Sequence, residues 1–154
     1  MDEKVRSFLE ANHLATMTTF RIDGMPHRAH VAVALVGGTL WSSGTARRMR
    51  TAFLRLNPSC RLIVFPTLEG GYATYHLGGP GSAYLGLETN VTIIEGPEVP
   101  DLSVELFKVL QPQAAPGSLV WQGQSRTYDE FRQIMRDEQR VIYQFEVVRA
   151  YGRY

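Results

Sequence analysis

Residues 27–58 read HRAHVAVALVGGTLWSSGTARRMRTAFLRLNP, and this stretch decides the fold that we expect. Its first part alternates apolar and polar side chains, as a strand with one buried face does. Gly37-Gly38 turns the chain into a second strand, Thr39 to Ser43, and apolar residues then recur at helical spacing from about Ala46 to Leu56. Asn57-Pro58 ends that helix. The stretch therefore predicts two strands of a meander followed by one short helix.

The flanking sequence extends this pattern in both directions. The further strands that we expect are Leu14 to Phe20, Cys60 to Phe65, Tyr84 to Ile94 and Arg140 to Tyr151. The further helices are residues 3–11, a segment from about Leu102 that stops before Pro112, and Arg126 to Gln139. The glycine-rich residues 66–83 fit a hairpin arm or a mobile loop. This order predicts an α+β fold built on a split, mostly antiparallel barrel with short flanking helices, and not a doubly wound parallel sheet.

Size and composition fit a single domain over residues 1–154, with 44% hydrophobic and 20% charged residues. A net charge of +1 gives no overall field that would favour nucleic acid or a membrane, so we expect neither as a partner. The charged start Met1-Asp2-Glu3-Lys4 lacks the apolar core of a signal peptide. The single cysteine, Cys60, permits no disulfide within the chain. We therefore expect a cytoplasmic protein.

Three arginines, Arg47, Arg48 and Arg50, fall at the start of the expected helix, just after Ser42-Ser43-Gly44-Thr45. The helix dipole disfavours each cation at that end by roughly 0.3–1 kcal/mol, so the arrangement indicates an anionic ligand. Helix N-termini bind phosphate through free N–H groups, and arginine and hydroxyl side chains add donors. The pattern favours a phosphate clamp; the alternative is a solvated basic face whose arginines pair with carboxylates elsewhere. In this helix we expect a buried stripe made of Met49, Ala52, Phe53 and Leu56.

The sequence lacks the usual patterns of a catalytic nucleophile or a metal centre. Zinc-site spacing is missing among its histidines, which are His13, His27, His30 and His76. Cys60 lies in an apolar run and fits the core, and no nucleophile elbow or Rossmann glycine motif is present. Such a chain either only binds its ligand or uses a cofactor that carries the chemistry. Trp121, which we place in a loop from Gln111 to Gln124, is a candidate to cover a planar ring.

Four segments in order make the sequence resemble a known superfamily. They are Ala11-Asn12-His13-Leu14-Ala15-Thr16, Asp23-Gly24-Met25-Pro26-His27, Gly38-Thr39-Leu40-Trp41 and an arginine-rich helix closing on Leu54-Arg55-Leu56-Asn57-Pro58. Together they resemble the pyridoxamine 5′-phosphate oxidase-like, flavin-binding split-barrel superfamily, above all the small actinobacterial branch that uses the deazaflavin coenzyme F-420. Only Lys4 and Lys108 among the 16 basic residues are lysines, which favours the GC-rich genome expected of that branch.

The resemblance also implies site residues. The family's phosphate motif is a hydroxyl or basic residue, a spacer, Lys or Arg, three spacers and Leu, and it falls on Arg48, Arg50 and Leu54. In the family, the backbone of one strand segment meets the tricyclic ring, and residues 30–33 occupy that segment here. Ser42, Ser43 and Thr45 occupy the hydroxyl-rich entry to the phosphate site. The candidate cofactor-binding residues are therefore His30, Val31, Ala32, Val33, Ser42, Ser43, Thr45, Arg48, Arg50 and, from its place in the loop, Trp121. No metal ligand and no catalytic side chain is assigned.

The resemblance implies a homodimer with cofactor sites at the subunit interface, and an oxidoreductase whose cofactor exchanges hydride with a small-molecule substrate. Coenzyme F-420 is the cofactor that we expect. Flavin mononucleotide (FMN) is the alternative, in an FMN-dependent oxidoreductase of the same superfamily. A third interpretation is a non-catalytic module that stores or carries a flavin or haem. The arginine clamp is common to all three.

Overall fold

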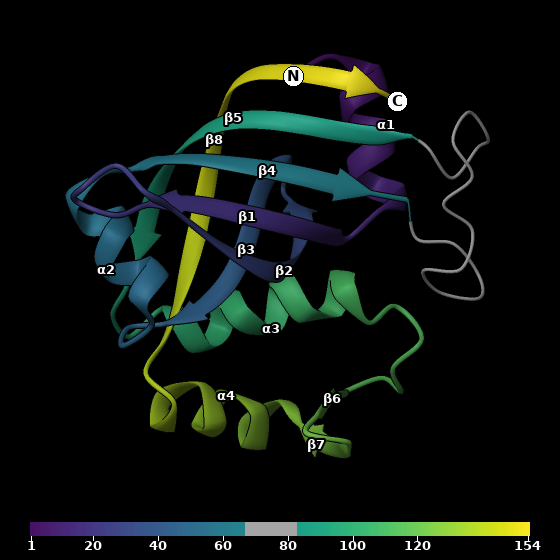
Figure 1. Cartoon of the computed structure of the whole chain (residues 1–154). Helices are drawn as coiled ribbons and strands as arrows, with labels where there is room; N and C mark the ends of the chain where they lie inside the picture. The colour runs from purple at the N-terminus through teal and green to yellow at the C-terminus, as the bar shows by residue number, and fades with distance from the viewer. Residues whose placement is uncertain (67–82) are drawn as a thin grey trace.

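The computed structural model of the protein describes residues 1–66 and 83–154, and its centre is a closed antiparallel barrel (Figure 1). The elements are α1 (Glu3–Ala11), β1 (Leu14–Phe20), β2 (Pro26–Val36), β3 (Thr39–Thr45), α2 (Met49–Leu56), β4 (Ser59–Phe65), β5 (Tyr84–Ile94), α3 (Val99–Leu110), β6 (Ser118–Trp121), β7 (Gln124–Thr127), α4 (Tyr128–Asp137) and β8 (Arg140–Arg153). Around the barrel the strands follow the order β1-β2-β3-β8-β5-β4. The α+β barrel predicted from the sequence is confirmed. The expectation for residues 66–83 falls almost wholly outside the described residues.

Aliphatic side chains fill the barrel because each strand turns alternate residues inward. In β4, Cys60, Leu62 and Val64 are fully buried, whereas the residues between them lie outside. Tyr143 of β8 is also fully buried inside the barrel. Each large apolar side chain removed from water in this way contributes about 1.5–3 kcal/mol. The interior is therefore a packed core, and the site must be sought at its ends and on its outer surface.

Strand β2 changes its partner along its length. Residues 26–32 pair with β1, and residues 33–36 pair with β3. At the fork, the Ser42 hydroxyl donates to the Ala32 carbonyl at 2.7 Å. On the side of β3, residues 26–32 have no strand partner among the described residues, because β3 turns away to pair with β8. The backbone edge of this part of β2 is therefore open to another hydrogen-bonding group.

Helix α2 lies at one end of the barrel (Figure 1), but its inward face differs from the one we expected. The expected stripe is wrong: Met49 is 61% exposed and Leu56 is 69% exposed. Arg50, Thr51 and Leu54 are buried instead. The reason is a polar contact, since the Thr51 hydroxyl donates to the Thr45 carbonyl at 2.7 Å and meets a tyrosine hydroxyl inside the barrel. The helix also begins at Met49, later than expected, with Arg48 as its N-cap residue.

Trp121 does not lie in a loop, so the loop expected from Gln111 to Gln124 is wrong at this residue. It ends β6, which pairs with β7 in a short hairpin. The turn between them uses positive φ angles at Gln122 (53°) and Gly123 (75°), as a two-residue hairpin turn requires. Helix α4 then begins at Tyr128, because the Thr127 side chain and Glu130 cap each other's backbone N–H groups.

Helix α3 covers the outside of the barrel, and α4 packs on α3 on the side away from the barrel (Figure 1). The barrel side of α3 packs against Ala34 and Ile142. The far side joins Leu119, Phe131 and Met135 in a separate cluster with Trp121. No helix in residues 1–66 or 83–154 is long and apolar enough to cross a membrane. The α4–β8 connection brings the chain back to the end of the barrel where β3 stops.

Candidate anion-binding site

Two strand ends meet where the arginine-rich segment begins. Thr45, the last residue of β3, pairs directly with Arg140, the first residue of β8. The Ala46 N–H then donates to the Gln139 carbonyl at 2.9 Å, which holds the connection to α2 against the connection to β8. Arg48 follows on this connection. The fold thus gathers arginines from two distant parts of the sequence at one end of the barrel.

Arg50 is buried without a hydrogen-bond partner for its Nε atom. Only 8% of the residue is exposed, and its guanidinium lies 5.7 Å from the ring centroid of Tyr143. No described residue accepts a hydrogen bond from Nε. A buried polar group that lacks a partner costs about 1–3 kcal/mol, and more when it is charged. An anion at this position would satisfy that donor.

Arg47 and Arg48 are exposed, and neither forms an ion pair with a described residue. Arg50, although buried, likewise forms no ion pair with a described residue. The alternative interpretation, a basic face paired with carboxylates elsewhere, is therefore not what the described residues show. The positive charge of this segment remains available to a ligand.

Arg140 lies close enough to Arg48 and Arg50 to feel their charges, and we call these three residues the arginine cluster. The Arg140 side chain is only 8% exposed. Its Nε and Nη2 donate to the Ser43 hydroxyl oxygen at 3.2 and 3.0 Å. Its Nη1 lies 3.5 Å from a carboxylate oxygen of Glu138. The guanidinium also stacks over the Trp121 ring, 5.1 Å from its centroid. Three groups, the Ser43 hydroxyl, the Glu138 carboxylate and the Trp121 ring, therefore fix its position.

The electrostatics of Arg140 reflect this crowding of positive charge. Burial lowers the pKa of the Arg140 guanidinium, Glu138 counteracts that effect, and the charges of Arg48 and Arg50 lower the pKa further. Arginine nevertheless keeps its proton in proteins. The cluster thus holds permanent positive charges that repel one another, with one carboxylate, Glu138, acting against them at Arg140.

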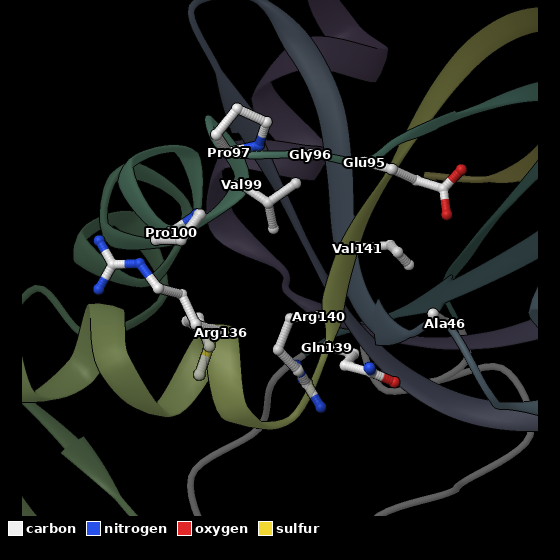
Figure 2. Close-up of a pocket in the computed structure, with 11 residues that line it drawn as sticks. Ala46, Glu95, Gly96, Pro97, Val99, Pro100, Arg136, Gln139, Arg140 and Val141 are labelled. Atoms are coloured by element: carbon white, nitrogen blue, oxygen red, sulfur yellow. The ribbon is translucent and has the colours of Figure 1, made fainter.

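A pocket of about 600 Å³ adjoins this cluster. Arg140 and Ala46 line it together with the β5–α3 connection and the end of α4. Figure 2 shows Arg136 and Arg140 on the side of the pocket formed by α4 and the start of β8, and Glu95 on the opposite side. Glu95 is engaged by a bidentate ion pair with Arg55. The pocket is large enough for an anionic group with attached carbon atoms.

The structure brings together some of the predicted site residues. Arg48, Arg50, Ser43 and Thr45 lie around the start of α2, and Trp121 contacts the cluster through Arg140. Trp121 packs edge-on against two phenylalanines, and its indole N–H donates to Glu138 at 3.0 Å.

Other predicted residues lie apart from the arginines. Ser42 is 1% exposed and its hydroxyl is engaged at the β2–β3 fork. Val31 and Val33 point into the core, whereas His30 and Ala32 are exposed. Residues 30–32 lie within the open edge of β2, so they present backbone groups as well as the exposed side chains of His30 and Ala32.

Sequence reasoning missed Arg140, Glu138 and Tyr143. No local pattern marks them, because Arg140 and its partner Ser43 are 97 positions apart. The one detectable signal concerns Arg140, which is a charged residue at the first position of a strand that pairs with the hydroxyl-rich end of β3.

No protein-family model matches this chain, and no curated protein matches its sequence. Solved structures do match its fold. A Listeria innocua protein assigned as a pyridoxamine 5′-phosphate oxidase superposes with a TM-score of 0.62 at 17% identity, over 97% of this chain and 95% of that chain. An F-420 reductase superposes with a TM-score of 0.63 at 18% identity, over 98% of each chain.

The haem storage protein HutZ of Vibrio cholerae has a TM-score of 0.65 at 10% identity, over 99% of this chain and 94% of that chain. Identities this low establish the fold and not the ligand. The protein therefore has the split-barrel fold of pyridoxamine 5′-phosphate oxidase-like proteins. The resemblance found in the sequence is confirmed at the level of the fold.

Proposed function

We propose that this protein is a single-domain, deazaflavin (coenzyme F-420)-dependent oxidoreductase that transfers hydride to an unidentified small molecule. The observation that carries the proposal is Arg50, a buried guanidinium with an unsatisfied Nε at the start of α2. Folding a charge into this position is costly unless a ligand completes it. Among structures with this fold, the F-420 reductase makes a phosphorylated deazaflavin a concrete candidate.

The residues present fit such a cofactor. Arg48 and Arg50 would hold its phosphate, with hydroxyl donors from Ser43 and Thr45. The open backbone edge of β2 at residues 30–32 would meet the polar edge of the ring. When bound, the cofactor would supply the hydride chemistry itself. The protein's part would then be to bind and orient, and no side chain is assigned as an acid, base or nucleophile.

Two other ligands are consistent with the same fold. FMN carries a phosphate that the same arginines would bind. Haem is supported by the likeness to a haem storage protein and by His30, an exposed imidazole on β2. Haem carries carboxylates and an iron that histidine can ligate, so it would engage the cluster without hydride transfer. A haem module would need His30, whereas a deazaflavin or flavin enzyme would need only the backbone there.

The test is a titration of the purified protein with coenzyme F-420, FMN and haem, followed by fluorescence and absorbance, for the native sequence and for Arg50→Ala and His30→Ala. We expect micromolar or tighter binding of coenzyme F-420 that is weakened by Arg50→Ala and unchanged by His30→Ala. Binding of FMN without coenzyme F-420 would transfer the function to the flavin alternative. Binding of haem alone, lost in His30→Ala, would make the protein a haem module.

A further inference from the structure

We propose that Arg140 is a third anion-binding residue of the cluster, and that the Glu138 carboxylate is an internal counter-anion that a ligand phosphate replaces. This inference goes beyond the proposed function, because it holds for any phosphorylated ligand of the cluster. It concerns residues that the sequence did not mark. Four geometric observations carry it.

The first observation is the balance of charge. Three arginines, Arg48, Arg50 and Arg140, face this end of the barrel, and Glu138 is the carboxylate that pairs with one of them. The pair is long, at 3.5 Å, compared with 2.8 Å between Arg132 and Asp101. Charge-assisted hydrogen bonds between nitrogen and oxygen are strongest near 2.7–2.9 Å. A phosphate that approaches closer would therefore compete well for Arg140.

The second observation is that Arg140 is held in place by groups other than Glu138. The Ser43 oxygen accepts from two of its nitrogens, and the Trp121 ring supports its face. The guanidinium would thus keep its position when the carboxylate leaves. Because Ser43 acts as an acceptor toward Arg140, its own hydroxyl proton is free to be donated to the incoming anion.

The third observation is that the Glu138 side chain can move alone. Its backbone N–H donates to the Ile134 carbonyl at 2.9 Å, which anchors the residue at the C-terminal cap of α4. Its side chain is 30% exposed and reaches solvent. Release of the carboxylate from Arg140 therefore requires a side-chain rotation and no rearrangement of the fold.

The fourth observation supplies a readout. The indole N–H of Trp121 donates to one Glu138 oxygen at 3.0 Å, and the other oxygen faces Arg140. A phosphate that displaces Glu138 from Arg140 would disturb both contacts. Trp121 fluorescence should therefore change when the cluster binds an anion, even when the anion itself absorbs no light.

The experiment is a titration with inorganic phosphate and with pyrophosphate, followed by calorimetry and by tryptophan fluorescence. We expect Glu138→Gln to tighten binding by about tenfold, since the competing charge is lost while an acceptor for Trp121 is kept. Asp137→Asn is the matched control: it removes the same charge one residue away, from a side chain bonded to Gln133, and should leave the affinity unchanged. Arg140→Gln should weaken binding by about tenfold or more.

Two further variants keep the test independent of folding. Arg140→Lys retains the charge but not the planar fork, and should bind more weakly than the native protein while unfolding at a similar denaturant concentration. Trp121→Phe should bind the anions but lose the fluorescence change. The inference is overturned if Glu138→Gln and Asp137→Asn have equal effects, or if Glu138→Gln does not tighten binding. If Arg50→Ala weakens binding while the Arg140 and Glu138 variants leave the affinity unchanged, the inference fails and the proposed phosphate site stands.

Discussion

The Thr51 hydroxyl oxygen lies 2.5 Å from the Tyr143 hydroxyl oxygen, in a buried contact between α2 and the barrel interior. Thr51 already donates its proton to the Thr45 carbonyl, so the Tyr143 O–H is the donor in this contact. Because Arg50 precedes Thr51 and lies over the Tyr143 ring, the contact decides which face of α2 turns inward. The contact thus positions Arg50, and with it the start of α2, relative to the barrel.

Tyr143→Phe should remove this hydrogen bond and leave the ring in place. We expect the free energy of unfolding to fall by about 1 kcal/mol, the usual net value of one buried hydrogen bond. Urea denaturation followed by circular dichroism measures this change. Tyr128→Phe is the control, because no described residue bonds to the Tyr128 hydroxyl. Equal stabilities of the two variants would contradict the structural role of Tyr143.

Arg50→Ala should weaken cofactor binding by roughly 1.5–3 kcal/mol, the range for a hydrogen bond to a charged group. Arg55→Ala should matter much less, because Arg55 lies further along α2 and is engaged with Glu95 at the surface. Isothermal calorimetry with FMN or coenzyme F-420 compares the two. A similar loss for both would indicate a general electrostatic effect and rule out a clamp at Arg50.

Gly44→Ala should destabilise the protein more than Gly24→Ala. A Cβ atom at Gly44 would overlap the buried Tyr143 ring, which has no room to move. At Gly24 the space is open and only the positive φ of 83° opposes a side chain, at a cost of roughly 1–2 kcal/mol. Thermal unfolding should show a lower midpoint for Gly44→Ala, by several degrees beyond Gly24→Ala. The reverse order would show that the ring can shift.

Cys60 should be unreactive in the folded protein. Burial raises the pKa of its thiol to about 12, so almost no thiolate exists at pH 8. A thiol reagent at that pH should label Cys60 only after urea is added. Above about pH 9 the unfolded chain loses this proton and the folded chain keeps it, so stability should fall as the pH rises toward 12. Rapid labelling without denaturant would contradict the buried position.

We expect a homodimer with cofactor sites at the subunit interface. Met49 and Leu56 of α2 and Val148 of β8 are all more than 60% exposed, and a partner surface would remove them from water. Sedimentation velocity at micromolar concentration should give about twice the monomer mass of 17.3 kDa. A single species at the monomer mass would refute shared sites.

Regular alternation made much of the barrel predictable. The bounds of β1 and β5 agree with the expected ones, because their apolar alternation stops at clear breaks such as Asp23-Gly24 and Pro97. The β6–β7 hairpin was not predicted, since its turn at Gln122-Gly123 has no Asn or Asp to mark it. Short strands outside the main sheet carry too few residues for a period to be read.

The site was predictable only where its residues lie close together in sequence. Arg48 and Arg50 stand out because they break the rule of helix charge, and that signal is local. The predicted inward face of α2 was wrong because Thr51 is buried through its hydrogen bond to Tyr143, which lies 92 positions away in sequence. Arg140 finds Ser43 across a similar distance. A prediction from helical spacing assigns the inward face to the most apolar side chains. In this helix, hydrogen bonds to the barrel determine the inward face instead.

The order of strands around the barrel also bears on how the chain acquires its fold. Strand β8 is the last of the six in sequence, yet it lies between β3 and β5 and pairs with both. During synthesis, the edges of β3 and β5 that pair with β8 therefore remain unpaired until residues 140–153 have left the ribosome. Contacts so distant in sequence form slowly, and waiting edges invite pairing with other chains. Overproduction at low temperature, where synthesis is slower and fewer nascent chains meet, should thus raise the yield of folded protein.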